Sequence, residues 1–496
     1  MVATGGQDTP EDETAQDPLK QADLDLSVTL LETTRVRALA SSPDVYALAE
    51  LIPPRSQGVA GRVAAFPDFV WLLFMGALGI FGSARKTAAA MADPVYWGLI
   101  AEGVGACLGP AESLRLPARG PSRDMWNWHS KRLHPHIPAL QERFQELAAR
   151  QALDAGYASA ERPRSLTAPE RGQFAVGDGA VVTSPVRDPD RKKTKKKGSK
   201  KNKDAEADRS DSSSADADEW VKPRRRDPGA GWHVEGGEED EGGHPVFGPK
   251  FVHTSIRDDR PLSRIILDMR YQPYGKGYGG EAALAVTMLL DAAARLPGLT
   301  GACWDGALRG LHRDPLMKTG LLAVSPQHDR IAPRRLTPVT DCPCSQRHDL
   351  WSKDGALHEA AILETGEVHL TPMTRIRLEP RGRRRCRWYQ LSRLSCGNTH
   401  RERLDATEED RRRGFNRAEH LRQHPPDTDG YTQCYRWRPD AESLNAQLDS
   451  TLWNRRMIAY GAPQQTIVML GFALAQNALT RHLHQRTSSH TDARTA

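Results

Sequence analysis

The order of apolar segments between residues 174 and 325 is the feature that most limits how this chain can fold. Three runs rich in β-branched residues come first, followed by a segment with a 3.6-residue apolar period that stops at a Pro-Gly pair. Two short strand-like runs and one short helix complete the order. The segments are 174–182, 250–256, 264–269, 279–298, 301–304, 311–318 and 321–325. Three strands followed by helix and strand units predict an α/β fold with a mixed sheet flanked by helices.

The region before this sheet, residues 26–165, is rich in Ala and Leu and predicts an all-α N-terminal domain. Its apolar run at 69–81 is shorter than the roughly 20 residues that a membrane-spanning helix needs, so we expect a buried helix. A second helix should follow, with Ser83 as its N-cap and Arg85 and Lys86 in its first turn. The pair is either an ordinary helical hairpin, which we favour because the spacing is common, or a DNA-binding helix-turn-helix.

Three polar and charged segments are predicted to lack a folded core. They are an acidic tail at 1–25, a charged loop at 188–245 and a flexible tail at 485–496. The loop contains RKKTKKKGSKKNK at 191–203, followed by an acidic stretch. It is predicted either to stay solvated or to bind phosphates nonspecifically through its lysines.

Residues 331–429 predict a basic, β-rich insertion with the short strands AAILE, EVHLT and RIRLE. The stretch RIRLEPRGRRRCRWYQLSR contains a single acidic residue, Glu379, and two adjacent aromatic residues. A solvated charge run seldom carries adjacent aromatics, so we favour a nucleic-acid-binding surface. The predicted DNA contacts here are Arg383, Arg384, Arg385, Arg387 and Trp388.

The seven cysteines are odd in number and scattered, which argues against a secreted disulfide framework and favours a reducing cytoplasm. Within the insertion, Cys342 and Cys344 precede His348, and Cys396 precedes His400 by four residues. This set could bind zinc. Its spacing is not that of a standard zinc finger, so we favour ordinary reduced cysteines over zinc.

Two aspartates occupy matched positions, Asp178 in VGDGAVV and Asp305 in CWDGALR. Asp-Gly is also a common hairpin signal, so either residue alone could belong to a turn. In a sheet of the predicted order, however, the first strand and the strand after the long helix are neighbours. Both carboxylates would then lie at one end of the sheet, where bound Mg²⁺ is the usual way to keep the two ionised.

Glu442 is the candidate third carboxylate, on a predicted helix four residues after Arg438. The simplest interpretation of this spacing is a surface ion pair worth about 0.2–0.5 kcal/mol. Tyr435, Arg438 and Glu442 also fit Y-x-x-R-x-x-x-E, the signature around the third acidic residue of a family of bacterial insertion-sequence transposases. Together with Asp178, Asp305 and the strand order, this motif resembles the DDE transposases, whose catalytic domain has the RNase H-like fold.

The resemblance implies an RNase H-like core formed by residues 166–330 and 430–484. It also implies that Asp178, Asp305 and Glu442 are both the catalytic residues and the ligands of two Mg²⁺ ions, with Mn²⁺ as a substitute. Such a site would perform in-line phosphoryl transfer without a covalent protein intermediate.

The resemblance further implies that Tyr435 and Arg438 contact DNA phosphates. One departure concerns the position seven residues after the glutamate, where the family usually has Lys and this chain has Asp449. The phosphate contact that this lysine makes in the family is therefore either absent from this chain or supplied by Arg455 or Arg456.

The expected function is therefore that of an enzyme, a Mg²⁺-dependent DDE transposase that cuts and joins DNA at insertion-sequence ends. Its expected partner is double-stranded DNA, both element ends and target, bound by a homodimer in the bacterial cytoplasm at the nucleoid, with no membrane. The alternatives are an RNase H-like nuclease and a noncatalytic DNA-binding protein, decayed or domesticated. The net charge of +6 is too small to identify a nucleic-acid partner by itself.

Overall fold

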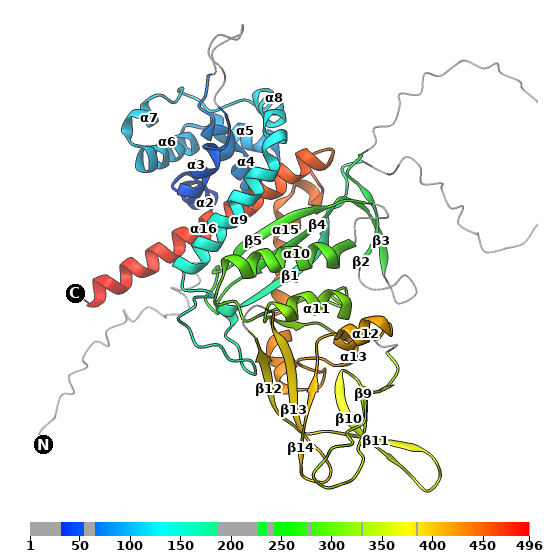
Figure 1. The fold of residues 1–496 in the computed structure, drawn as a ribbon. Coiled ribbons are helices and arrows are strands. Elements are labelled where there is room, and N and C mark those ends of the chain that lie inside the picture. The colour runs from blue at the N-terminus through cyan, green and yellow to red at the C-terminus, as the bar shows by residue number, and fades with distance from the viewer. Residues whose placement is uncertain are drawn as a thin grey trace, which may run out of the picture.

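The computed structural model shows a mixed α/β protein in which a helical region and a β-rich lobe lie on opposite sides of a central sheet (Figure 1). The structure describes residues 31–53, 65–186, 188, 227–235, 243–274, 280–328, 331–382 and 385–495. The predicted acidic tail at 1–25 and the lysine-rich segment at 191–203 lie outside these residues.

The central sheet has five strands in the order β5-β4-β1-β6-β7. These are β1 Phe174–Val181, β4 Lys250–Ile256, β5 Ile265–Gln272, β6 Gly301–Cys303 and β7 Leu322–Val324. The first three pair antiparallel, whereas β6 and β7 continue the sheet parallel to β1. Helices α10 (Gly280–Arg295) and α11 (Gly310–Lys318) connect the parallel strands. The predicted order is confirmed, including the adjacency of β1 and β6.

The helical region packs onto this sheet and shares one hydrophobic core with it. Its helices are α2 Glu32–Ala40, α3 Pro43–Ala49, α4 Phe69–Phe81, α5 Ala84–Ala92, α6 Pro94–Leu108, α7 Pro110–Leu114, α8 Arg123–Leu133 and α9 Ile137–Asp154. Short 3-10 turns, η1 His134–His136 and η2 Arg171–Gln173, accompany them. Every residue of α4 is buried, as predicted, and the Ser83 side chain caps α5 by accepting a hydrogen bond from the backbone N–H of Lys86 at 3.3 Å.

Across the residues that the structure describes, no single helix is long and apolar enough to cross a membrane. Helices α4 and α5 together would qualify by length and composition, but they are bent by 113° relative to each other.

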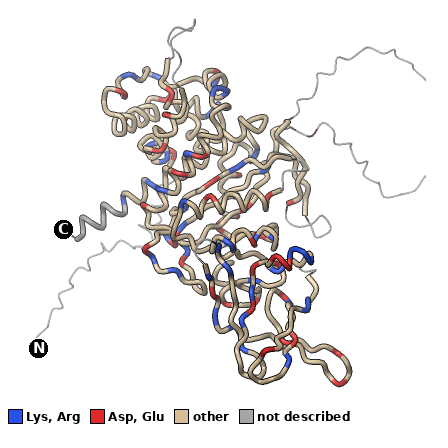
Figure 2. The backbone as a smooth tube through the Cα atoms, viewed as in Figure 1, with Lys and Arg blue, Asp and Glu red and all other residues tan. Residues whose placement is uncertain are grey.

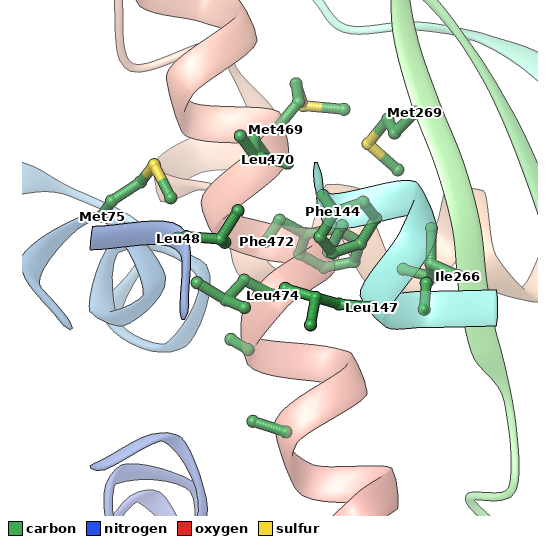
Figure 3. Packing of buried hydrophobic residues seen from close by; sticks show 14 of the residues in the cluster. Leu48, Met75, Phe144, Leu147, Ile266, Met269, Met469, Leu470, Phe472 and Leu474 are labelled. Carbon is green, nitrogen blue, oxygen red and sulfur yellow. The ribbon is translucent and has the colours of Figure 1, made fainter. Parts of the chain in front are cut away.

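Helix α16, Ala462–Thr495, runs through the centre of the shared core. In Figure 3, its apolar side chains lie between those of α3 and α4 on one side and those of α9 and β5 on the other. A Cβ at Gly471 would lie 2.1 Å from the backbone oxygen of Met75, so α4 and α16 can approach this closely only because no side chain intervenes. The helical backbone continues to Thr495, so residues 485–495, which the sequence predicted as a flexible tail, are assigned to this helix.

The β-rich lobe contains two antiparallel sheets. The first consists of β8 Arg334–Arg335, β9 Asp349–Lys353, β10 Ala356–Ile362 and β11 Val368–Pro372, and the second of β12 Arg375–Arg381, β13 Arg387–Arg393 and β14 Thr399–Arg403. Helices α12 Glu408–Arg412 and α13 Arg417–His420 follow. The lobe and strands β1, β6 and β7 of the central sheet share a second core, in which Trp388 is completely buried.

The predicted charged loop at 188–245 contains structure that its composition did not predict. Strands β2 Gly231–Glu235 and β3 His244–Gly248 form a hairpin in which Trp232 and Phe247 pair. Asp227, directly before the hairpin, is buried and accepts hydrogen bonds from Gln465 of α16 at 2.9 and 3.0 Å. The loop prediction is therefore wrong for residues 227–235 and 244–245, because a few apolar residues and one buried carboxylate are enough to attach them to the core.

Candidate active site

Three carboxylates converge where β1 and β6 lie side by side. Oxygen atoms of Asp178, Glu281 and Asp305 all lie within 4.8 Å of one another. Asp178 lies in β1, Asp305 follows β6 by two residues, and Glu281 lies in the first turn of α10. The structure thus brings together the two aspartates that the sequence predicted and adds Glu281, which it did not.

The glycines on both sides of Asp178 make room for this arrangement. Asp178 pairs with His253 across the β1–β4 ladder, so the Asp-Gly pair is part of a strand and not a turn. A Cβ at Gly177 would lie 2.1 Å from the Trp304 ring, and a Cβ at Gly179 would lie 2.4 Å from Glu281 Oε2. Both contacts are too short for any side chain, so the Gly-Asp-Gly sequence allows Trp304 and Glu281 to approach the strand.

Two neighbours hold Glu281 in place. The indole N–H of Trp304 donates to its Oε1 at 2.9 Å, and the ammonium of Lys250 lies 2.7 Å from its Oε2. Both partners lie at strand ends beside the site. Lys250 is the first residue of β4, and Trp304 directly follows β6. The sequence signal for Glu281 is weak, since an acidic residue in the first turn of a helix is common for electrostatic reasons alone.

Arg438 connects the carboxylates to Glu442. Its Nη2 lies 3.0 Å from Asp178 Oδ2, and its Nη1 lies 3.7 Å from Glu442 Oε1. Within the described part of the chain, neither Nε nor Nη1 of this buried side chain has a hydrogen-bond partner. The Glu442 side chain is 66% exposed and is not one of the converging carboxylates. The Arg438 guanidinium therefore lies between Glu442, the predicted third carboxylate, and Asp178.

Helix α15, Pro439–Thr451, is docked against β1 by polar contacts. The Asn445 side chain donates to Asp178 Oδ2 at 2.9 Å, and its Oδ1 lies 2.8 Å from Nε2 of the buried His253. At the start of the helix, Asp440 accepts hydrogen bonds from Arg171 at 2.6 to 3.0 Å. These contacts fix the position of the helix that carries Glu442 relative to the sheet.

Burial changes the titration of the site. It raises the pKa of Asp178 to about 6, with Glu281 and Asp305 adding to the effect and Arg438 opposing it. Burial, with the nearby Glu281, also raises the pKa of Asp305. Burial lowers the pKa of His253 to about 4, so this imidazole is neutral at pH 7. Asp178 is mostly ionised at pH 7 but binds a proton in mildly acidic solution.

Tyr435 lies near the site but on a different helix from Glu442. It is the last residue of α14, Asp429–Tyr435, and its ring stacks on that of Tyr431 at a centroid distance of 5.0 Å. Burial raises the pKa of its hydroxyl. The charge of Arg438 opposes this increase, and the charges of Asp305 and Glu442 add to it. All three residues of the Y-x-x-R-x-x-x-E motif therefore lie close to the carboxylate cluster.

Asp449 is exposed on α15, and the arginines considered as substitutes for the family's lysine lie just beyond the helix. Arg455 ends the 3-10 turn η4, Trp453–Arg455, and both it and Arg456 are exposed. The ammonium of Lys86 from α5 lies 4.2 Å from the centre of the half-exposed Trp453 ring. The basic tip of α5 and the end of α15 thus form one surface, which we name the α5–α15 surface.

The basic stretch of the lobe divides between the two faces of β13. Arg387, Tyr389 and Arg393 point outward, whereas Trp388 is completely buried and donates from its indole to the backbone oxygen of Met317 at 2.7 Å. The prediction of a DNA contact is therefore wrong for Trp388, because the two-residue period of the strand turns it into the core. Arg385 and Arg387 are exposed, and Arg383 and Arg384 lie outside the described residues.

Three arginines from two strands surround Glu379 on the outward face of this sheet. They are Arg377 of β12, Arg381 of the same strand at 2.8 Å and Arg401 of β14 at 3.3 Å. One carboxylate cannot neutralise three guanidinium groups, so the face keeps a positive charge. Figure 2 shows Lys and Arg along the strands of the lobe with Asp and Glu interspersed.

A second metal-binding candidate lies in the lobe, where Cys342, Cys344, His348 and Cys396 converge. His400, which the sequence paired with Cys396, is oriented differently, since its Nε2 lies 3.0 Å from Glu402 Oε2.

Comparison with models of known protein families, with curated proteins and with solved structures found no match to this chain. The functional proposal therefore depends on the geometry of the carboxylates and on the Y-x-x-R-x-x-x-E motif.

Proposed function

We propose that this chain is a DDE transposase that cuts and joins DNA at the ends of an insertion sequence. The observation that carries the proposal is the convergence of Asp178 and Asp305 from neighbouring parallel strands. The strand order β5-β4-β1-β6-β7 supports it, because this order agrees with the RNase H-like fold that the motif implies. Neither observation alone separates a transposase from other phosphoryl-transfer enzymes, and Y-x-x-R-x-x-x-E favours the transposase.

The converging residues fit a divalent metal ion. Their donor atoms are carboxylate oxygens, which Mg²⁺ prefers over nitrogen and sulfur ligands. Asp178, Glu281 and Asp305 would hold the ion in the arrangement seen here. A bound metal would supply the positive charge that activates a water or a DNA 3′-hydroxyl and stabilises the leaving oxygen.

Arg438 is the proposed phosphate-binding residue of the site. It is buried, it lies against Asp178, and two of its nitrogens lack hydrogen-bond partners among the described residues. Guanidinium N–H groups that are buried without a hydrogen-bond partner favour a phosphate oxygen. In this assignment Arg438 orients the DNA backbone beside the carboxylates, with Tyr435 next to it.

Two exposed basic surfaces are the proposed contacts to the flanking DNA. The α5–α15 surface, with Lys86 and Trp453, lies about 15 Å beyond Glu442 along the helix, at about 1.5 Å of rise per residue. The outward face of β12–β14 carries Arg377, Arg381 and Arg401. Phosphate contacts from these surfaces would position a duplex without reading its sequence.

The test is the variant Asp305→Asn, assayed for Mg²⁺-dependent cleavage and strand transfer on DNA that carries the element ends. The amide cannot supply the negative charge that holds the ion, so we expect both activities to be lost while DNA affinity is retained. Asp124→Asn, at a position that is 86% exposed in the helical region, is the matched control and should behave as the unmodified chain. Equal cleavage by Asp305→Asn and the unmodified chain would contradict the proposal.

One observation favours the noncatalytic alternative. Asp178 and Glu281 already have cationic partners in Arg438 and Lys250, and Glu442 is exposed outside the cluster. An ion-pair network of this kind could stabilise a DNA-binding protein that performs no chemistry. DNA binding without cleavage by the unmodified chain would favour this alternative, and cleavage without strand transfer would favour an RNase H-like nuclease.

A further inference from the structure

Four potential zinc ligands from two separate parts of the lobe converge on one point. The ligand atoms of Cys342, Cys344, His348 and Cys396 all lie within 4.8 Å of one another. Cys344 Sγ lies 3.2 Å from both Cys342 Sγ and His348 Nε2, and Cys342 Sγ lies 3.7 Å from Cys396 Sγ. The sequence offered these four residues, together with His400, as a possible zinc set, but their spacing is not that of a standard finger and Cys396 is 54 residues from Cys342.

Tight backbone turns present these side chains. Ser345 has a left-handed φ of 61°, and its N–H donates to the Cys342 oxygen at 2.9 Å, so the chain reverses directly after Cys344. His348 is then held by a two-way backbone pairing with Val339 at 2.9 and 3.0 Å. Cys396 lies in the turn between β13 and β14, which Gly397 closes with a φ of 87°. The ligands are therefore positioned by hydrogen-bonded backbone.

A carboxylate orients the histidine of the cluster. His348 Nδ1 lies 2.5 Å from Glu359 Oε1, which leaves Nε2 directed at the cysteine sulfurs. Glu359 is itself held by Ser395, whose N–H and hydroxyl both donate to it at 2.8 Å. Metal-binding histidines almost always donate their other ring N–H to a carboxylate, a backbone carbonyl or a water, and Glu359 is a partner of this kind. Glu359 belongs to β10 and Ser395 to the β13–β14 turn, so these contacts connect the two sheets of the lobe.

We propose that Cys342, Cys344, His348 and Cys396 form a structural Zn²⁺ site that joins the two sheets of the lobe. Three sulfurs and one imidazole are the ligand types that zinc prefers, and four protein ligands leave no open position for catalysis. Zn–S bonds of about 2.3 Å in a tetrahedron place sulfurs about 3.8 Å apart, close to the Cys342–Cys396 separation. On binding, the three thiols release their protons to solvent and the histidine stays neutral.

The first test is metal analysis of the full chain, purified with reductant and without added metal. We expect about one zinc per chain by mass spectrometry of the metal content. Exchange for Co²⁺ should give the visible absorption of a tetrahedral cobalt site together with sulfur-to-cobalt charge-transfer bands. Metal-free protein with all seven thiols titratable after denaturation would overturn the proposal. So would a metal-free protein with five titratable thiols, because it would indicate a disulfide within the cluster.

Substitutions then identify which residues bind the metal. Cys344→Ser and Cys396→Ser should each lose the zinc, whereas Cys396→His, which keeps a ligand atom, should bind it again. His400→Asn in β14 and Cys107→Ser in α6 are matched controls outside the cluster and should keep one zinc per chain. Glu359→Gln should keep the site but weaken Zn²⁺ binding by about 10–100-fold, measured by competition with a chelating dye.

The zinc proposal and the transposase proposal fail separately. Asp305→Asn should retain full zinc content even though it loses cleavage. Zinc that persists in both serine variants and disappears in Asp305→Asn would assign the metal to the carboxylates and overturn the zinc proposal. If the serine variants do not fold, the cobalt spectrum of the unmodified chain and the affinity of Glu359→Gln still decide the outcome.

Discussion

The carboxylates at the edge of the central sheet and the Cys/His cluster in the lobe are assembled by different parts of the fold. Pairing of β1 with β6 brings Asp178 and Asp305 together, and buried cationic partners accompany them. Hydrogen-bonded turns bring the Cys/His ligands together, and a carboxylate orients their histidine. The first cluster offers hard oxygen ligands beside an arginine whose Nε and Nη1 have no hydrogen-bond partner among the described residues, and the second offers soft ligands in a complete set of four. Under the two proposals, the carboxylates would form a reactive centre in the sheet and the Cys/His ligands a structural one in the lobe.

The largest expected effect is on the rate of DNA cleavage. It distinguishes the carboxylates, which are proposed to need Mg²⁺, from the Cys/His cluster, which is proposed to bind zinc. Asp178→Asn, like the omission of Mg²⁺, should lower the rate of DNA cleavage by about 1,000-fold or more, which corresponds to about 4 kcal/mol in the barrier. The zinc content of the same protein should not change. Cleavage kinetics and metal analysis on one preparation check both statements. Loss of zinc together with cleavage would show that the two centres are not independent.

The two Asp-Gly pairs of the sequence should respond differently to the same substitution. Gly179→Ala would place a Cβ 2.4 Å from Glu281 Oε2, so Glu281 has to move, and we expect cleavage to fall by about 10–100-fold. Gly306→Ala is the matched control, because no described atom lies within 4 Å of its Cβ position. Cleavage rates and melting temperatures of both variants provide the measurement. Full activity of Gly179→Ala would remove Glu281 from the site.

The pKa of Asp178 predicts how the reactive centre depends on pH. In the proposed site the metal would bind the ionised carboxylate, and because the pKa is about 6, protons would compete with the metal below this pH. The Mg²⁺ concentration for half-maximal cleavage should rise by up to about tenfold per pH unit as the pH falls below 6. Mg²⁺ titrations between about pH 5 and pH 8 test this.

Asp268 provides the control for that measurement. Burial also raises its pKa to about 6, but it pairs with Arg270 and Gln145 away from the carboxylate cluster. Asp268→Asn should keep the pH profile of the unmodified chain. An Mg²⁺ requirement that is the same at both ends of the pH range would show that Asp178 does not hold the metal.

The smallest expected effect concerns the basic face of the lobe. Arg385→Ala combined with Arg387→Ala should weaken DNA binding by several-fold and reduce the slope of log affinity against log salt by up to about one unit per lost phosphate contact. Arg119→Ala, at an exposed position in the helical region, is the control. Binding curves at several salt concentrations measure the slope. An unchanged slope would exclude these arginines from the DNA interface.

Local pattern was sufficient to predict the elements of the central sheet and the end of α4. The β-branched runs and the helical period depend on neighbours within one segment, and the order of those segments restricts the sheet enough to make β1 and β6 adjacent. That adjacency is why Asp178 and Asp305 could be paired from the sequence. The Ser83 cap was predictable for the same reason, because capping involves only the next three residues.

Contacts between segments far apart in the chain decided the rest. Glu281 joins the carboxylates only because Gly179, Trp304 and Lys250 make room for it and hold it, and Trp388 is buried only because the strand register turns it toward Met317. Cys396 reaches Cys342 through the packing of two sheets whose relative position no local pattern encodes. The sequence by itself determined the strands, the helices and the paired aspartates, because short-range sterics and periodicity specify them. The tertiary structure alone decided that Glu281 joins the two aspartates and that Cys396 reaches Cys342, because side-chain packing across the whole chain selects these contacts.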